Sequence, residues 1–168
     1  MSMSPAIRKL MLTVHIASSV GWLGAIVAYI ALNVPIYASD DQQIVRAAYV
    51  MMEPVLRYAL IPLAAIALVT GMVQALGTPW GLLRHYWVVI SLVLTAFAFV
   101  ILVLHLPAVE AIAAVAADPA GDVDQLCGDL FHAVGGMVVL LVPLALNIYK
   151  PRGMTRYGWR RAQRPPAG

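Results

Sequence analysis

Long apolar stretches dominate the pattern of hydrophobic and polar positions along this chain. Four windows contain no charged residue: 10–39, 58–83, 86–109 and 130–149. An α-helix rises about 1.5 Å per residue, so each window is long enough to cross a hydrocarbon layer of roughly 30 Å. Lipid offers the backbone no hydrogen-bonding partner, so a spanning segment must be helical. We therefore predict membrane-spanning helices over about 10–33, 55–77, 86–107 and 130–149.

The connections between these windows indicate the topology. The connection at 77–84 is short and contains Gly77, Pro79 and Gly81, so the second and third helices should form a tight antiparallel hairpin. The other two connections, 34–54 and 107–129, are longer. We predict an all-α fold, a transmembrane four-helix up-down-up-down bundle, formed by a single domain that covers residues 1–168.

Composition supports the same class of protein. The chain is 62% hydrophobic and 11% charged, whereas about 25% of the residues of a soluble domain are charged. The single cysteine, Cys127, excludes an internal disulfide. We find no serine nucleophile motif, carboxylate pair, phosphate-binding loop or zinc motif, so the sequence leaves open whether the protein is an enzyme.

The distribution of charge predicts the orientation. One side of the predicted bundle carries nine basic residues and no acid: Arg8, Lys9, Arg84, Lys150, Arg152, Arg156, Arg160, Arg161 and Arg164. The other side carries Arg46 and Arg57 together with all eight acids. By the positive-inside rule, both termini lie in the cytoplasm of a bacterial inner-membrane protein, and the 34–54 and 107–129 connections lie outside.

The basic segment at 150–168 is a predicted membrane-surface tail. Its six basic residues are interleaved with Tyr157 and Trp159, a composition typical of an interfacial anchor on anionic lipid. Nucleic acid is the less favoured partner for such a juxtamembrane segment. A homo-oligomer or another membrane protein remains an open alternative for the bundle itself.

Histidines provide the candidate chemistry, beginning with His15 inside the first span. Helical spacing places His15, Ser19 and Trp22 on one stripe, and an ionisable group at that depth is expected to be functional or hydrogen-bonded to a neighbouring helix. His85, at the start of the third helix, lies on the same side of the membrane. The pair could hold a b-type haem, with Arg84 near a propionate. No Cys-x-x-Cys-His motif exists for covalent attachment.

Copper binding or transport at the outer face is the alternative. The outer side brings soft and borderline ligands of the kind that suit Cu(I): His105, His132, Met51, Met52 and Cys127. Their spacing is loose, and the adjacent Met51 and Met52 cannot face the same way on a helix. A third alternative is a membrane subunit or scaffold without catalytic activity. A bound haem would serve redox chemistry or sensing.

Several segments resemble a bacterial four-helix membrane family of unknown function, over nearly the whole chain. They are His15-Ile16, Gly21-Trp22-Leu23-Gly24, Gly77-Thr78-Pro79-Trp80-Gly81-Leu82, His85-Tyr86-Trp87-Val88-Val89 and Tyr149-Lys150-Pro151-Arg152-Gly153-Met154-Thr155. The first helix resembles, more distantly, the bacterial membrane protoporphyrinogen oxidase and the membrane domain of copper-resistance D proteins.

The resemblance to the oxidase implies a role for one histidine. A first-helix histidine of that family is associated with haem, and His15 matches its position. The third-helix Trp-x-His-x-Lys pattern of the oxidase matches Trp87 but meets Val89 and Ser91 in place of histidine and lysine. His85 lies one turn earlier, where it could take the place of that histidine.

Overall fold

The computed structural model describes residues 3–78 and 80–163, and within these ranges it contains helices and no β-strand. Four helical segments are long and apolar enough to cross a membrane. The first, third and fourth spans are α1 (Pro5–Ala38), α4 (Tyr86–Ala117) and α5 (Leu130–Tyr149). The second span is one continuous helix that consists of α2 (Gln42–Val55), η1 (Leu56–Leu60) and α3 (Ile61–Gly77). Two short helices complete the chain: η2 (Val123–Gln125) and α6 (Arg156–Ala162). The all-α prediction is confirmed.

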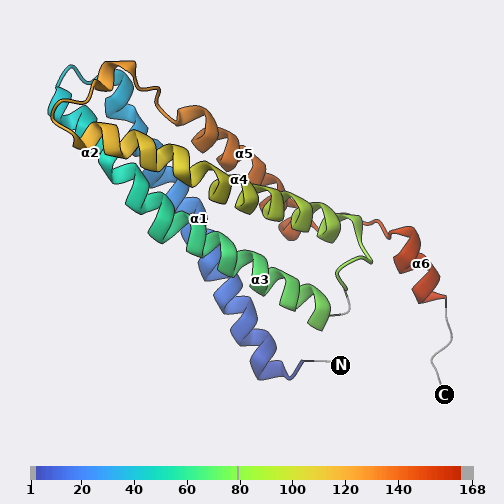
Figure 1. Cartoon of the computed structure of the whole chain (residues 1–168). Coiled ribbons are helices and arrows are strands. Elements are labelled where there is room, and N and C mark those ends of the chain that lie inside the picture. The colour runs from blue at the N-terminus through green and yellow to red at the C-terminus, as the bar shows by residue number, and fades with distance from the viewer. Residues whose placement is uncertain (1–2, 79, 164–168) are drawn as a thin grey trace.

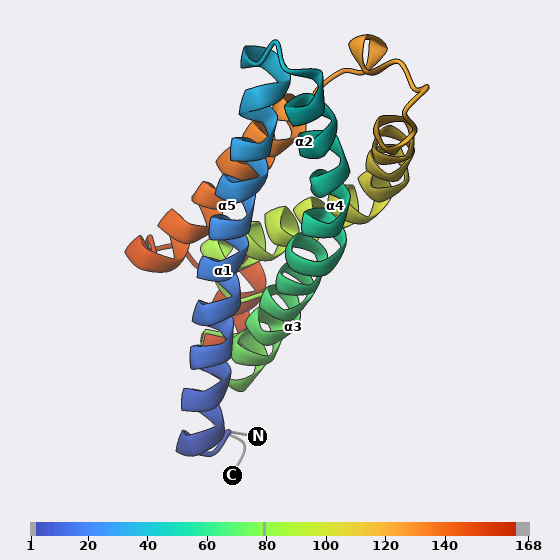
Figure 2. The same ribbon diagram turned by 90° about the vertical axis from the view of Figure 1, so that its left-hand side faces the viewer.

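The four spans form a ring in which each packs mainly against two neighbours. α1 packs against the α2 to α3 helix and α5, and α4 packs against the same two, so α1 and α4 lie diagonally. Figure 1 shows the first turns of α1 and the short α6 at one end of the bundle, with the connections after α1 and after α4 at the other end. Figure 2, turned by 90°, shows that successive spans run in opposite directions. This is an up-down-up-down bundle.

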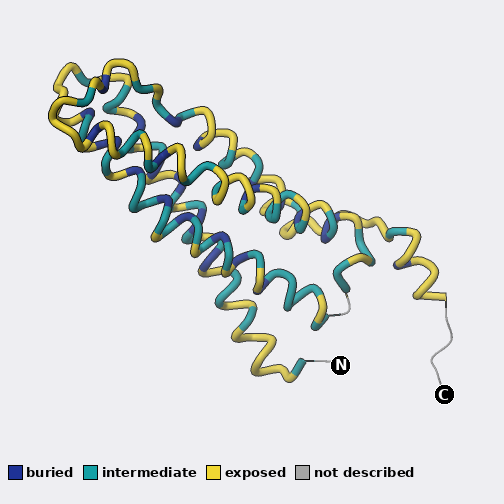
Figure 3. The backbone as a smooth tube through the Cα atoms, in the orientation of Figure 1, coloured by how far each residue is buried: buried dark blue, intermediate teal, exposed yellow. Residues whose placement is uncertain are grey.

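Burial is concentrated on the inward faces of the helices, as Figure 3 shows. The largest fully buried side chains include Tyr49, Met52, Leu56 and Val109, where α2 packs on α4. Many large apolar side chains point outward, among them Phe131, which is 85% exposed. An apolar outer surface of this extent is unfavourable in water and favourable in lipid. The structure therefore fits a multi-pass membrane protein.

Three of the four helices are longer than predicted. α1 begins at Pro5 because the Ser4 side chain accepts a hydrogen bond from the backbone of the first turn, and it continues to Ala38. The second span begins at Gln42 rather than near residue 55, since Asp41 caps it. α4 continues through Pro107 to Ala117. The predicted outer loops at 34–54 and 107–129 are therefore largely helical, and the connections shrink to 39–41 and 118–129.

Arg46 holds the extended end of α4 against α2. Its Nη1 donates to the carbonyl oxygens of Ala116 at 3.2 Å and Asp118 at 2.8 Å. Its Nη2 donates to the carbonyl oxygen of Gly121 at 2.5 Å. The last carbonyls of a helix have no intrahelical donor, so a guanidinium that caps several of them stabilises both the helix end and the turn after it. This basic side chain explains why the helix persists into the predicted loop.

A second arginine ties the same span to α4 about three helical turns further along. Arg57 forms ion pairs with Glu53, one turn before it, and with Glu110 of α4. It lies within the π-helical turn η1, where the backbone N–H of Ile61 donates to the carbonyl oxygen of Leu56. Pro62 follows at once and has no N–H to donate, which favours a local change in the hydrogen-bond ladder.

Candidate metal centre

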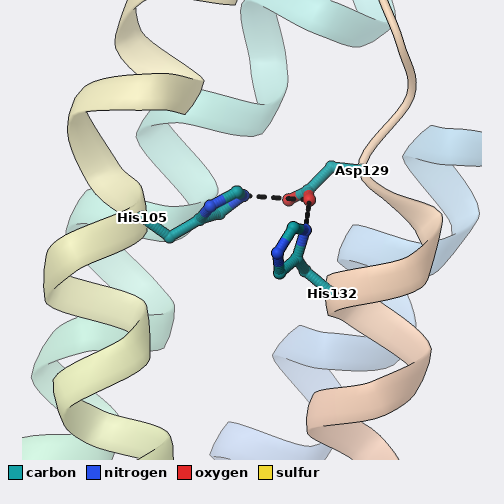
Figure 4. Close-up of side chains that lie close together, drawn as sticks. All are labelled: His105, Asp129 and His132. Atoms are coloured by element: carbon teal, nitrogen blue, oxygen red, sulfur yellow. Dashed lines mark hydrogen bonds and ion pairs between the residues drawn. The ribbon is translucent and has the colours of Figure 1, made fainter.

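Two histidines from different helices meet one buried carboxylate near the loop-bearing end of the bundle. His105 lies on α4, His132 lies in the first turn of α5, and Asp129 immediately precedes α5. His105 Nε2 lies 2.9 Å from Asp129 Oδ1, and His132 Nδ1 lies 2.8 Å from the same oxygen (Figure 4). The two imidazole rings have centroids 4.2 Å apart. We call these three residues the His/Asp cluster.

The first helix fixes the orientation of Asp129. The phenol of Tyr29 donates to Asp129 Oδ2 at 2.7 Å, and the Asn33 Oδ1 accepts from the backbone N–H of Asp129 at 2.8 Å. Asn33 in turn donates to the carbonyl oxygen of Tyr29 at 3.0 Å. With Oδ2 held by the phenol, Oδ1 is the oxygen that faces the histidines. A carboxylate that is only 6% exposed is thereby positioned from three helices.

The hydrogen bonding of the cluster is incomplete. His132 Nδ1 hydrogen-bonds to Asp129 Oδ1, but the contact of His105 Nε2 with that oxygen lacks hydrogen-bond geometry. His105 Nε2 is consequently a buried nitrogen without a hydrogen-bond partner among residues 3–78 and 80–163. A buried polar atom that lacks a partner costs free energy, so it calls for an explanation. A metal ion that accepts the lone pair of His105 Nε2 would explain why this nitrogen has no hydrogen-bond partner.

The arrangement suits a metal ion. One ligand atom from each of His105, Asp129 and His132 lies within 4.8 Å of the other two. Ligands about 2.0 Å from a tetrahedral ion lie about 3.3 Å from one another, so each histidine nitrogen would need to move only slightly away from Asp129 Oδ1. Asp129 is buried, whereas the His132 side chain is 52% exposed. Three protein ligands with one exposed edge leave a coordination position open to solvent.

The residues of the predicted copper set are only partly brought together. His105 and His132 meet as that alternative requires. Met52 is buried in the apolar core, and Met51 is 50% exposed, so the adjacent methionines face different ways. Cys127 is exposed and does not join the cluster. The carboxylate in place of sulfur favours a divalent ion over Cu(I), because Cu(I) prefers soft ligands.

His15 lies at the interface of α1 and α3. Its Nδ1 is 3.0 Å from the carbonyl oxygen of Ala67 and 3.1 Å from the Thr70 hydroxyl. The ring lies over Gly71, where an added Cβ would be 3.1 Å from His15 Cε1. Hydrogen bonding to a neighbouring helix is one of the two interpretations predicted for this residue. Ser19 is half-buried on the same helix, and Trp22 is buried in the apolar core with its Nε1 unpaired among the described residues.

His85 lies in a separate aromatic group. Its ring centroid is 5.2 Å from that of Trp80 and 6.4 Å from that of Trp87, and the Lys150 ammonium lies over Trp80. Arg84 precedes it in the connection between α3 and α4, where its carbonyl oxygen accepts from the backbone of Thr155. The ring of His15 contacts α3, whereas the ring of His85 contacts Trp80 in this connection and Trp87 at the start of α4.

Sequence reasoning missed the carboxylate at the centre of the cluster. Asp129 and His132 are three residues apart, a spacing that places both on one face at a helix start, and this signal was available. Tyr29 and Asn33, four apart in an apolar span, also share a face. Which of the eight acids would approach His105 depends on the packing of α4 against α5, which the sequence does not specify.

Comparison with protein families, curated proteins and solved structures finds no match to this chain.

Substitution of Tyr29 by phenylalanine tests whether α1 holds the cluster. Loss of the hydrogen bond to Asp129 leaves one oxygen of a buried carboxylate without its donor, which should lower the free energy of unfolding by about 1–3 kcal/mol. Thermal unfolding of the detergent-solubilised protein measures the change. Tyr149→Phe is the matched control, since Tyr149 is 82% exposed and lies at the opposite end of α5 from Asp129. Equal stability of Tyr29→Phe and wild type would show that the contact contributes nothing.

Proposed function

We propose that this chain is a small multi-pass protein of the bacterial inner membrane that binds a divalent transition-metal ion at the His/Asp cluster. The observation that carries the proposal is the convergence of two imidazoles on one buried, oriented carboxylate. Binding of the ion would join α4 to α5 and, through Tyr29 and Asn33, to α1. We infer a role in handling or sensing metal at the outer face of the membrane.

The chemistry of the ligands defines the class of ion. Two imidazoles and one carboxylate suit Fe²⁺, Ni²⁺, Cu²⁺ or Zn²⁺. Affinity for such sites generally rises from Fe²⁺ through Ni²⁺ to Cu²⁺ and is lower again for Zn²⁺. Imidazole binds metal only when that nitrogen carries no proton, so the nitrogens that face Asp129 must be free of protons when the ion binds. Metal binding should therefore weaken as the pH falls. Tyr29 and Asn33 act as the outer partners that orient the carboxylate.

Zinc binding to the purified protein tests the proposal directly. His105→Ala removes one of three ligands and should lower Zn²⁺ affinity on the order of a hundredfold or more, since loss of an outer-shell partner alone costs tenfold to a hundredfold. Isothermal titration in detergent measures the affinity, and Co²⁺ gives visible absorption bands for a four-coordinate site. His85→Ala, which removes a histidine from the other end of the bundle, should leave Zn²⁺ affinity unchanged. Equal loss in both variants would contradict the proposal.

The orientation of the bundle decides which compartment supplies the ion. The excess of basic residues at 8–9, 84 and 150–164 supports cytoplasmic termini and an outward-facing cluster. Residues 164–168 of the predicted tail lie outside the described residues. The connection at 118–129, which leads into the cluster, is acidic and contains Cys127.

The native cysteine offers a test of this orientation. Cys127 is the single cysteine and is exposed, so a membrane-impermeant maleimide should label it in intact spheroplasts. A variant that carries Cys127→Ser and Ala162→Cys moves the thiol to α6 and should react only after the membrane is permeabilised. The reverse pattern of labelling would place the His/Asp cluster in the cytoplasm.

A second candidate function, b-type haem binding, is favoured by the orientation of His15. A histidine that ligates a metal commonly gives its other ring N–H to a backbone carbonyl, as the contact of His15 Nδ1 with Ala67 allows. Nε2 would then face the iron, with His85 as a proposed second ligand and Ser19, Trp22 and Arg84 as proposed contacts. Haem at this position would be separate from the ion at the His/Asp cluster.

Absorption spectroscopy tests the haem proposal. Purified wild-type protein supplied with haemin should show a Soret band and a b-type reduced spectrum, and His15→Ala should lose most of the pigment because the axial ligand is gone. His105→Ala serves as the control and should keep the spectrum. Wild-type protein that stays colourless with haemin would assign His15 a structural role as a hydrogen-bonding partner of α3.

A further inference from the structure

The chain that follows α5 turns back and pairs with the connection between α3 and α4. The backbone N–H of Thr155 donates to the carbonyl oxygen of Arg84 at 2.9 Å, and that of Tyr86 donates to the carbonyl oxygen of Gly153 at 3.4 Å. These bonds form an antiparallel bridge between His85 and Met154. The segment at 150–155 is thus fixed to the end of the bundle opposite the His/Asp cluster.

The short helix α6 is held in place by the same contact. The Thr155 hydroxyl donates to the carbonyl oxygen of Leu83 at 2.6 Å and accepts from the backbone N–H of Gly158 at 3.0 Å. Gly158 is buried against the connection, and a Cβ at this position would lie 2.3 Å from the carbonyl oxygen of Arg84. Only glycine permits this approach without displacement. We call the contact of Thr155 and Gly158 with 83–84 the tail clamp.

The clamp leaves one face of α6 exposed, and this face is basic and aromatic. The described tail, 150–163, carries five basic residues and no acid: Lys150, Arg152, Arg156, Arg160 and Arg161. Trp159 is 60% exposed. A shallow surface pocket is lined by Met154, Thr155, Arg156, Trp159 and Arg160. Two guanidinium groups four residues apart on a helix therefore flank an apolar and aromatic floor.

We propose that this pocket binds the headgroup of an anionic phospholipid of the inner leaflet. Arginine recognises phosphate through paired N–H donors, and tryptophan favours the depth at which headgroups meet acyl chains. Only six residues separate α6 from the end of α5, so the pocket lies next to the membrane surface. The tail clamp fixes the two arginines relative to that surface. This proposal is independent of metal or haem binding.

A fluorescent label on α6 reports the interaction in the full-length protein. The label is attached at Ala162→Cys in a Cys127→Ser background, and the protein is reconstituted in nanodiscs of phosphatidylcholine with or without phosphatidylglycerol. With phosphatidylglycerol present, we expect the emission of the label to shift to the blue and the label to rotate more slowly. Loss of two basic groups near an anionic surface should weaken the interaction about thirtyfold, so Arg156→Gln with Arg160→Gln should need a higher phosphatidylglycerol fraction for the same blue shift.

Two controls distinguish the pocket from general charge attraction. Arg8→Gln with Lys9→Gln removes the same charge from the N-terminal flank and should leave the response of the label unchanged. Gly158→Val forces α6 off the connection and should reduce the response although every arginine remains. Circular dichroism checks that both variants keep the helical content of the wild type.

Several results would overturn the proposal. An equal response to phosphatidylcholine and phosphatidylglycerol would show that the headgroup charge is not recognised. The same response to inorganic phosphate or to an RNA oligonucleotide in phosphatidylcholine nanodiscs would assign the pocket to a soluble anion or to nucleic acid. A response that Gly158→Val leaves intact would show that the clamp does not position the arginines.

Discussion

The loop-bearing end of this bundle depends on one buried carboxylate. A charge that is removed from water must be paired and hydrogen-bonded, or the fold loses several kcal/mol. Asp129 meets this requirement by accepting from Tyr29 on α1 and by facing histidines on α4 and α5. Because the partners come from three spans, this single group constrains how α1, α4 and α5 approach one another. A metal ion at the same oxygen would use contacts that the fold already makes.

The two ends of the molecule are built for different environments. At the loop-bearing end, Arg46 and Arg57 bind the second span to α4, and His105 and His132 meet Asp129. At the other end, basic residues dominate, and the tail clamp fixes α6 beside the connection between α3 and α4. The asymmetry of charge that predicts orientation thus coincides with an asymmetry of architecture. We propose metal binding at one end and lipid binding at the other.

Much of the fold could be predicted from the sequence because spanning a membrane restricts the choice. The uncharged windows predicted all four spans, and the bounds of α5 were predicted at 130–149 as observed. The ends of the other helices were harder to predict, because Asp41 and Arg46 stabilise helical turns in segments whose composition alone indicates loops. Proline did not end α4 at residue 107, because a membrane helix can tolerate the lost hydrogen bond.

Of the three residues in the His/Asp cluster, the sequence singled out the two histidines but not the aspartate. The distribution of charge placed His105 and His132 on the same side of the membrane, and in the structure their ring centroids lie 4.2 Å apart. The third member, Asp129, comes from a connection whose path back to α5 is fixed by Asn33, a contact that spans almost a hundred residues. Met51, Met52 and Cys127 share a side of the membrane with the histidines, but a shared side does not specify which side chains converge.

X-ray absorption at the zinc edge of the zinc-loaded protein tests the central claim most directly. If His105, Asp129 and His132 bind the ion, the spectrum should contain nitrogen and oxygen ligands at about 2.0 Å and the multiple-scattering signal of two imidazoles. Asp129→Asn should alter this first shell or abolish it. A sulfur ligand at about 2.3 Å would instead identify Cys127 as a ligand and would contradict the account, as would a shell without imidazole.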